Sequence, residues 1–249
     1  MKLIDTHCHI GQEEFNSDRE DVIKRADELG VHMISSGISP DSWDYAIEIG
    51  KKYSNVSASI GLDPLLMDEI ELAMSALSKY QHDVVAVGEI GLDHYRERDH
   101  ANREVQESGF RKMVSLALEY KLPIQVHSRS AGRSALGILS DMEAGLVHMH
   151  AFDGRASLAR TASRDLGYYF SIPTSVVRSP QKQKLVKAIN IERLLLETDS
   201  PVLGPVKGER NEPSNIWSAL REVARLLRRE EEEIREITLE NTMRLYSRI

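Results

Sequence analysis

The stretch Lys2-Leu3-Ile4-Asp5-Thr6-His7-Cys8-His9 opens the chain with a short apolar run that leads into two histidines. The apolar residues are typical of a buried strand, in which alternate side chains point to the same face. His7 and His9 therefore share a face, while Cys8 points the other way. Two imidazoles placed in this way can bind one metal ion, although paired histidines near a strand end can also be purely structural.

Seven further apolar runs of strand length follow, separated by stretches with the apolar spacing of amphipathic helices. We expect the first strand to open at residues 2–4 and the others to cover residues 33–38, 56–60, 84–87, 123–126, 145–150, 167–172 and 191–196. Strands that alternate with helices predict a parallel sheet, and eight parallel strands close most simply into a TIM barrel of the α/β class. The residues from Pro213 onward predict two extra C-terminal helices.

Length and composition limit the class of protein. A chain of 249 residues falls in the size range of one TIM-barrel domain, so we expect a single domain over residues 1–249. The net charge of −7 gives no broad basic surface for binding duplex DNA along its length. The single cysteine fits a reducing compartment, and the chain has neither a secretory signal pattern nor an apolar run of membrane-spanning length. We therefore expect a cytoplasmic protein with no membrane contact and no obligate protein partner.

Six side chains with metal-binding chemistry lie at the ends of the expected strands: His7, His9, Glu89, His127, His150 and Asp199. In a TIM barrel the active-site groups gather at the C-terminal ends of the strands, so these six should meet in one opening, which we call the mouth. Four imidazoles and two carboxylates exceed the needs of one tetrahedral zinc ion. They suit two divalent ions bridged by a carboxylate, whereas the alternative is a scatter of structural histidines.

The motifs of this chain resemble those of the TatD family of metal-dependent hydrolases, within the wider group of amidohydrolase-like barrels. They occur in the family's order and cover essentially the whole chain. The matching stretches are Asp5-Thr6-His7-Cys8-His9, Val87-Gly88-Glu89-Ile90-Gly91-Leu92-Asp93, Val126-His127-Ser128-Arg129, His150-Ala151-Phe152-Asp153-Gly154, Glu197-Thr198-Asp199-Ser200-Pro201, Arg210-Asn211-Glu212-Pro213 and Glu240-Asn241-Thr242-Met243-Arg244-Leu245-Tyr246.

The resemblance implies a role for each of the six residues. It implies that His7, His9 and Asp199 hold one divalent ion, that His127 and His150 hold a second, and that Glu89 bridges the two. It also implies hydrolysis of phosphodiester bonds in DNA, with exonuclease behaviour, on DNA ends or short single strands. The mixed nitrogen and oxygen ligands would accept Mg²⁺, Mn²⁺ or Zn²⁺.

The expected chemistry assigns catalytic roles to two carboxylates. Glu89 is the natural bridge because a carboxylate has two oxygens to share between two ions, and no lysine follows a strand end to supply a modified bridge. Asp199, at the edge of the metal site, is placed to take the proton of the attacking water. Two cations would lower the pKa of that water and polarise the phosphate.

Six further residues complete the expected site. Arg129, Arg210, Asp63 and Tyr95 are candidates for substrate binding, and Asp93 and His148 for supporting positions behind the metal ligands. Arg129 and Arg210 could instead form plain salt bridges, and Asp93 could be an ordinary loop residue. His148 repeats the H-x-H spacing with His150 and is expected to be a packed or supporting histidine, the alternative being that it is the ligand of that pair. Asp63 stands where the TatD family usually has a histidine, and it adds negative charge where a phosphate must bind.

Two alternative functions use the same residues. The same hydroxide could attack a carbonyl, which would make the protein an amidohydrolase that cleaves a small amide or ester, since fold alone does not fix the substrate. The chain could also be a metal-binding scaffold without turnover. The presence of all six candidate ligands weighs against such a loss of activity.

Overall fold

A computed structural model describes residues 2–249, in which eight parallel strands form one sheet in the order β1 to β8. The strands are β1 (Leu3–Cys8), β2 (Val31–Gly37), β3 (Val56–Ile60), β4 (Ala86–Gly91), β5 (Ile124–His127), β6 (Val147–Met149), β7 (Tyr169–Pro173) and β8 (Leu194–Glu197). Each strand pairs with the next along the chain in parallel register. This sheet confirms the TIM-barrel fold expected from the alternation of strands and helices.

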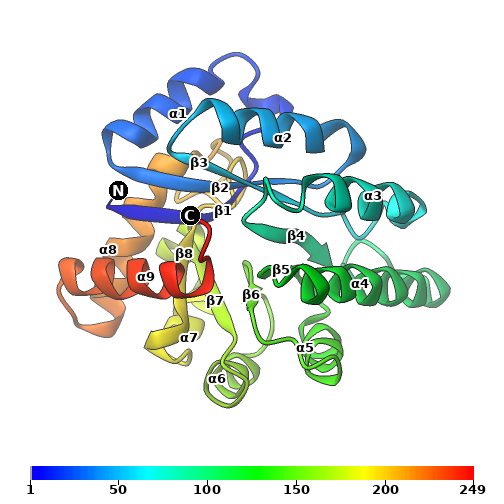
Figure 1. The fold of residues 1–249 in the computed structure, drawn as a ribbon. Coiled ribbons are helices and arrows are strands. Elements are labelled where there is room, and N and C mark those ends of the chain that lie inside the picture. The colour runs from blue at the N-terminus through cyan, green and yellow to red at the C-terminus, as the bar shows by residue number, and fades with distance from the viewer. Residues whose placement is uncertain (1) are drawn as a thin grey trace.

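The helices surround the strands on the outside of the barrel (Figure 1). They are α1 (Arg19–Glu28), α2 (Pro40–Lys52), α3 (Ile70–Tyr80), α4 (His100–Tyr120), α5 (Gly132–Asp141), α6 (Ala156–Asp165), α7 (Pro180–Val186), α8 (Ile216–Leu227) and α9 (Glu231–Leu245). Their apolar faces bury residues such as Val22, Phe110 and Val223 in one core cluster with the strands. None of the helices among the described residues has the length and apolarity that a membrane span requires.

The barrel closes where the first and last strands meet. The backbone N–H of Asp199 donates to the carbonyl of His7 at 2.9 Å, and that of His9 donates to the carbonyl of Ser200 at 2.8 Å. The buried carboxylate of Asp5 accepts from the backbone N–H of Thr198 at 2.8 Å. These bonds tie the end of β1 to the residues after β8. They therefore also fix the candidate ligands His7 and His9 relative to Asp199.

The extra C-terminal helices predicted from the sequence are α8 and α9. Arg228, in the left-handed conformation with φ 56°, ends α8 and turns the chain towards α9. Helix α9 packs against β1 and β8, and Leu245 at its end joins a buried cluster with Ile4 and Leu195 of those strands. Asn241 of this helix donates to the carbonyls of Ile191 and Leu194 at 2.8 and 2.9 Å. Tyr246, directly after α9, is fully buried.

One strand boundary differs from the prediction in a way that affects the site. The fourth strand was expected over residues 84–87, but β4 covers Ala86–Gly91 and therefore contains Glu89. Two glycines permit the strand to lie this close to its neighbours. A Cβ at Gly61 would lie 2.1 Å from the carbonyl oxygen of Glu89, and one at Gly91, where φ is 147°, would lie 2.0 Å from that of His127.

Candidate metal centre

The side chain of Glu89 lies between two pairs of histidines at the mouth. Its Oε1 atom is 2.6 Å from Nδ1 of His127 and 2.9 Å from Nε2 of His150. Its Oε2 atom is 3.3 Å from Nε2 of both His7 and His9. Each carboxylate oxygen thus faces its own pair of imidazole nitrogens.

Hydrogen bonds on the far side of the first pair determine where the ring protons lie. Nδ1 of His9 lies 3.2 Å from the carbonyl of Ser36, which can only accept, so this nitrogen carries the proton. Nδ1 of His7 lies 3.3 Å from Oε1 of Gln125, whose amide nitrogen already donates to the carbonyl of Thr6. In the neutral rings, the Nε2 atoms of both histidines therefore present lone pairs to each other, at 3.1 Å, and to Glu89.

Two carboxylates lie behind the second pair, one within hydrogen-bond distance of His127 and the other in a longer charge contact with His150. Nε2 of His127 lies 3.3 Å from Oδ2 of Asp93, and Nδ1 of His150 lies 3.6 Å from Oε2 of the fully buried Glu197. These partners leave Nδ1 of His127 and Nε2 of His150 free of protons in the neutral rings, 3.3 Å apart. Carboxylates behind metal-binding histidines commonly fix the ring orientation and the tautomer in this way.

In the neutral state of the rings, the lone pairs of the four imidazoles and the oxygens of Glu89 face one another without donors between them, an arrangement that bound cations would stabilise. Ligand atoms bound to one ion at about 2.1 Å lie about 3.0–3.4 Å apart, and most of the separations around Glu89 fall in or near that range. In the metal-free protein, protons take the place of the cations. Burial alone would lower the pKa of His9 and His127, but Asp199, Glu89 and Asp93 raise these values to about 10 and about 9. The donor set fits divalent ions.

Asp199 joins the first pair from the segment after β8, the strand that lies beside β1 where the barrel closes. Its Oδ1 atom is 3.6 Å from Nε2 of His9 and 3.8 Å from Nε2 of His7. The residue has a φ of 53°, a left-handed conformation that costs a non-glycine residue about 1–3 kcal/mol. The bonds that close the barrel on both sides of Asp199 hold it there, and so its carboxylate points into the mouth.

The described residues therefore contain three overlapping groups of possible metal ligands. They are His7 with His9 and Glu89, His7 with His150 and Asp199, and Glu89 with His127 and His150. Together they bring together all six of the ligand residues expected from the sequence. They come from β1, β4, β5, β6 and β8 or from the residues that directly follow those strands.

Above the cluster lies a cavity of about 740 Å³, which opens to solvent at the mouth. Arg129 lies over the ring of Tyr95, 4.0 Å from its centre, and lines this cavity. Asp63 lines it as well, 3.5 Å from a guanidinium nitrogen of Arg96, so its negative charge is partly compensated. Three of the four residues expected to bind substrate are thus at or beside the cavity.

The remaining expected residues lie elsewhere. Arg210 is not among the residues that line the cavity, because its guanidinium pairs with both oxygens of Asp18 at 2.7 and 2.6 Å. His148 lies deeper in the barrel, where its ring nitrogens contact the hydroxyls of Tyr246 and Ser171, both at 2.6 Å. Asp93 lies behind His127, as the sequence suggested.

Sequence reasoning missed several residues that build the site. Gln125 and Glu197 support His7 and His150 from behind, and Ser36 supports His9. The signal for Gln125 was its place in the apolar run before His127, two positions away and so on the same face. Lys182, on α7, also lines the cavity, and nothing in its local sequence indicated this.

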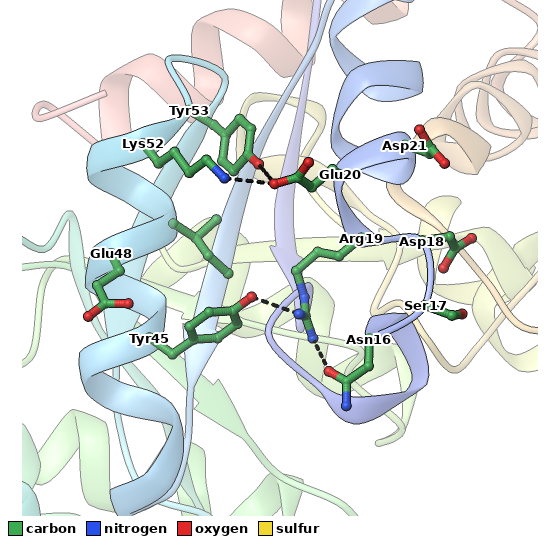
Figure 2. Close-up of a pocket in the computed structure, with 11 residues that line it drawn as sticks. Asn16, Ser17, Asp18, Arg19, Glu20, Asp21, Tyr45, Glu48, Lys52 and Tyr53 are labelled. Carbon is green, nitrogen blue, oxygen red and sulfur yellow. Dashed lines mark hydrogen bonds and ion pairs between the residues drawn. The ribbon is translucent and has the colours of Figure 1, made fainter.

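A second hollow, of about 550 Å³, lies between α1 and α2 on the outside of the barrel (Figure 2). Several of its polar side chains pair with one another. Arg19 bonds Tyr45 and Asn16 at 2.6 and 2.7 Å, and Glu20 bonds Lys52 at 2.7 Å. These contacts join the two helices, so the cluster at the mouth remains the candidate site.

Comparisons with known proteins agree with this geometry. Residues 4–247 match the family model described as TatD related DNase. The human protein named deoxyribonuclease TATDN3 is 34% identical over 263 residues, covering 99% of this chain and 95% of that protein. A metal-dependent hydrolase of Methanocaldococcus jannaschii, itself uncharacterized, is 35% identical over 252 residues and covers 100% of this chain and 98% of its own. The crystal structure of YJJV, a TatD homologue from Escherichia coli, superposes with a TM-score of 0.90 at 26% identity, covering 99% and 98% of the two chains.

Proposed function

Because this chain belongs to the TatD-related DNase family, we propose that it is a metal-dependent hydrolase that cleaves phosphodiester bonds in DNA. One observation supports the proposal above all others. The two oxygens of Glu89 face separate pairs of imidazole nitrogens, 2.6 and 2.9 Å away on one side and 3.3 Å on the other. A carboxylate shared in this way is the bridge that a two-ion site requires.

The proposed ligands divide between two divalent ions, which would be Mg²⁺, Mn²⁺ or Zn²⁺. His7, His9 and Asp199 would hold one ion, His127 and His150 the other, and Glu89 would contribute one oxygen to each. When bound, the ions would supply a Lewis acid for the phosphate and lower the pKa of the attacking water.

The protein's own groups would orient and complete the reaction. Asp199 would accept the proton of the attacking water as the new bond to phosphorus forms and the bond to the leaving oxygen breaks. Asp93 and Glu197 would keep His127 and His150 with their lone pairs towards the site. Arg129, unpaired with any carboxylate among residues 2–249, would bind a phosphate oxygen from the cavity wall.

The proposed substrate is a DNA end or a short single strand. A chain with a net charge of −7 has little to attract long duplex DNA, so contacts would be limited to the nucleotides nearest the mouth. A cavity of about 740 Å³ has room for a nucleotide rather than for a duplex.

The one cysteine, Cys8, agrees with a cytoplasmic location.

The test is the time course of shortening of an end-labelled single-stranded DNA oligonucleotide. It is run in chelator and with added Mg²⁺, Mn²⁺ or Zn²⁺, beside a panel of small amides and esters. Two variants accompany the unaltered protein: Glu89→Gln, and Glu48→Gln as a matched control on the exposed side of α2. We expect stepwise shortening that needs both metal and Glu89 and is unchanged in Glu48→Gln. Cleavage of the amides or esters without any shortening of DNA would contradict the proposal.

A further inference from the structure

Lys182 is a buried cation that the proposed chemistry leaves without a role. Its side chain on α7 belongs to a residue only 7% exposed, yet the residue lines the mouth cavity. The ammonium donates to the carbonyls of Ala151 and Phe152 at 2.6 and 2.8 Å. Ala151 directly follows the candidate ligand His150, so this ammonium is held beside the metal cluster.

The charge of Lys182 is not neutralised by a salt bridge. Within residues 2–249 it forms no ion pair with a carboxylate, and its two hydrogen-bond partners are both backbone carbonyls. Burial lowers the pKa of Lys182 to about 8, while the negative charges of Glu197, Asp153 and Asp199 work in the opposite direction. At neutral pH most molecules therefore carry the full positive charge at this position.

The other cations around the mouth differ from Lys182. Arg96 is 3.5 Å from Asp63, and Arg210 is engaged by Asp18 outside the cavity. Arg129 is stacked on Tyr95 and exposed. Lys182, by contrast, is both buried and held in place by its hydrogen bonds.

A buried ammonium without a carboxylate is costly unless hydrogen bonds satisfy it. An ammonium has three donors, and the carbonyls of Ala151 and Phe152 take two of them. A ligand with a negatively charged oxygen in the cavity would satisfy the third donor and the charge together. A phosphate group of a DNA substrate has such an oxygen, and the proposed reaction brings it beside the metal cluster.

We propose that Lys182 binds a non-bridging phosphate oxygen of the nucleic-acid strand and so positions that strand over the metal cluster. The inference rests on the proposed nuclease function and deepens it by assigning a phosphate subsite. In this arrangement Lys182 holds the strand from the β6–α7 side of the mouth, and Arg129 holds it from the side of β5.

The experiment measures the equilibrium Kd of a fluorescent single-stranded oligonucleotide by anisotropy, in chelator so that no strand is cleaved. Lys182→Met removes the charge and the donors, and Lys182→Gln keeps a donor for the carbonyls if the methionine variant folds poorly. Lys184→Met is the matched control, because Lys184 is an exposed lysine on the same helix. Oligonucleotides with a neutral methylphosphonate at each linkage in turn identify the phosphate concerned.

For the unaltered protein we expect one linkage at which the methylphosphonate weakens binding about 10- to 100-fold, the range for a hydrogen bond to a charged group. Lys182→Met or Lys182→Gln should weaken binding of the natural strand to the same extent and be insensitive to the methylphosphonate at that linkage. Lys184→Met should behave as the unaltered protein. This non-additivity distinguishes a contact with phosphate from a role in shaping the loop at Ala151.

Two results would overturn the inference and are distinguishable from each other. The phosphate subsite would be ruled out, and the nuclease function left intact, by either of two outcomes. One is that the Lys182 variants bind as tightly as the unaltered protein; the other is that their loss of affinity adds equally to the loss from a methylphosphonate at every linkage. If the unaltered protein neither bound nor shortened DNA, the proposed function itself would fail and the phosphate subsite with it.

Discussion

Gly61 offers a test of how closely Glu89 must be held. The Cβ of an alanine at this position would lie 2.1 Å from the carbonyl oxygen of Glu89 and 2.6 Å from its carbonyl carbon. Contacts of a Cβ below 3.0 Å are essentially never found, so this contact is about 0.9 Å too short. The obstacle is backbone and cannot swing away, hence β4 must shift and carry Glu89 with it.

The expected loss follows from that displacement. A misplacement of about 1 Å in a reacting group can lower the rate about 100-fold, so we expect Gly61→Ala to reduce kcat/KM on DNA by about that factor. Overpacking of this kind costs about 1–3 kcal/mol of folding free energy. Because domains of this kind are stable by about 5–15 kcal/mol, the variant should still fold at room temperature.

The assay is the shortening of labelled single-stranded DNA at saturating metal, together with the number of metal ions bound per chain. Gly137→Ala is the matched control, because the Cβ it would add on α5 meets nothing within 4 Å beyond its chain neighbours and the helix's own local backbone. That substitution should leave the rate unchanged and raise the stability by about 0.5–1 kcal/mol. A folded Gly61→Ala protein with normal metal content and kcat/KM would refute the claim that this contact positions Glu89.

Three further substitutions or conditions test separate parts of the site. Asp93→Asn should lower the affinity for metal about 10- to 100-fold, because it weakens the group that orients the ring of His127 from 3.3 Å away. Calorimetric titration measures the affinity, and an unchanged value would contradict the orienting role of Asp93. His148→Asn should still bind two metal ions per chain, but it should lower the free energy of unfolding by about 1–3 kcal/mol because the contacts with Tyr246 and Ser171 are lost. Loss of one bound ion per chain would instead show that His148 is a ligand. The carboxylates raise the pKa of His9 to about 10 and of His127 to about 9 against the effect of burial. A raised imidazole pKa stabilises the metal-free fold fully below about pH 6.5, and this stabilisation is lost as the pH rises through 9 and 10. The melting temperature in chelator should therefore fall over that range, and binding of metal should release protons; a rising melting temperature would contradict the assignment.

The sequence allowed prediction of those parts of the site that depend on strand ends. Four strands, β1, β5, β6 and β8, carry these ligands on or just after their carboxyl ends: His7 and His9, His127, His150 and Asp199. Parallel strands present their carboxyl ends at one edge of a barrel. Once the alternation of strands and helices was recognised, the convergence of these side chains followed from topology. The expected number of strands and the C-terminal helices are confirmed for the same reason.

Residues whose place depends on packing between distant segments could not be predicted. Lys182 reaches the mouth from α7 because the carbonyls after His150 accept its ammonium, a contact across about thirty positions of sequence with no local pattern. Arg210 follows β8, as expected, but the nearby carboxylate of Asp18 holds it away from the cavity lining. Glu89 was expected after its strand and lies within it, because Gly61 and Gly91 let β4 continue past it.

We propose that Glu89 joins two metal ions into one catalytic unit. The most direct measurement titrates the metal-free protein with Mn²⁺ while bound ions per chain and the rate of DNA shortening are followed together. We predict two equivalents per chain, with turnover appearing only as the second one binds, and in Glu89→Gln at most one tight equivalent and no turnover. Full activity with a single equivalent, or two tight equivalents and normal turnover in Glu89→Gln, would contradict the account.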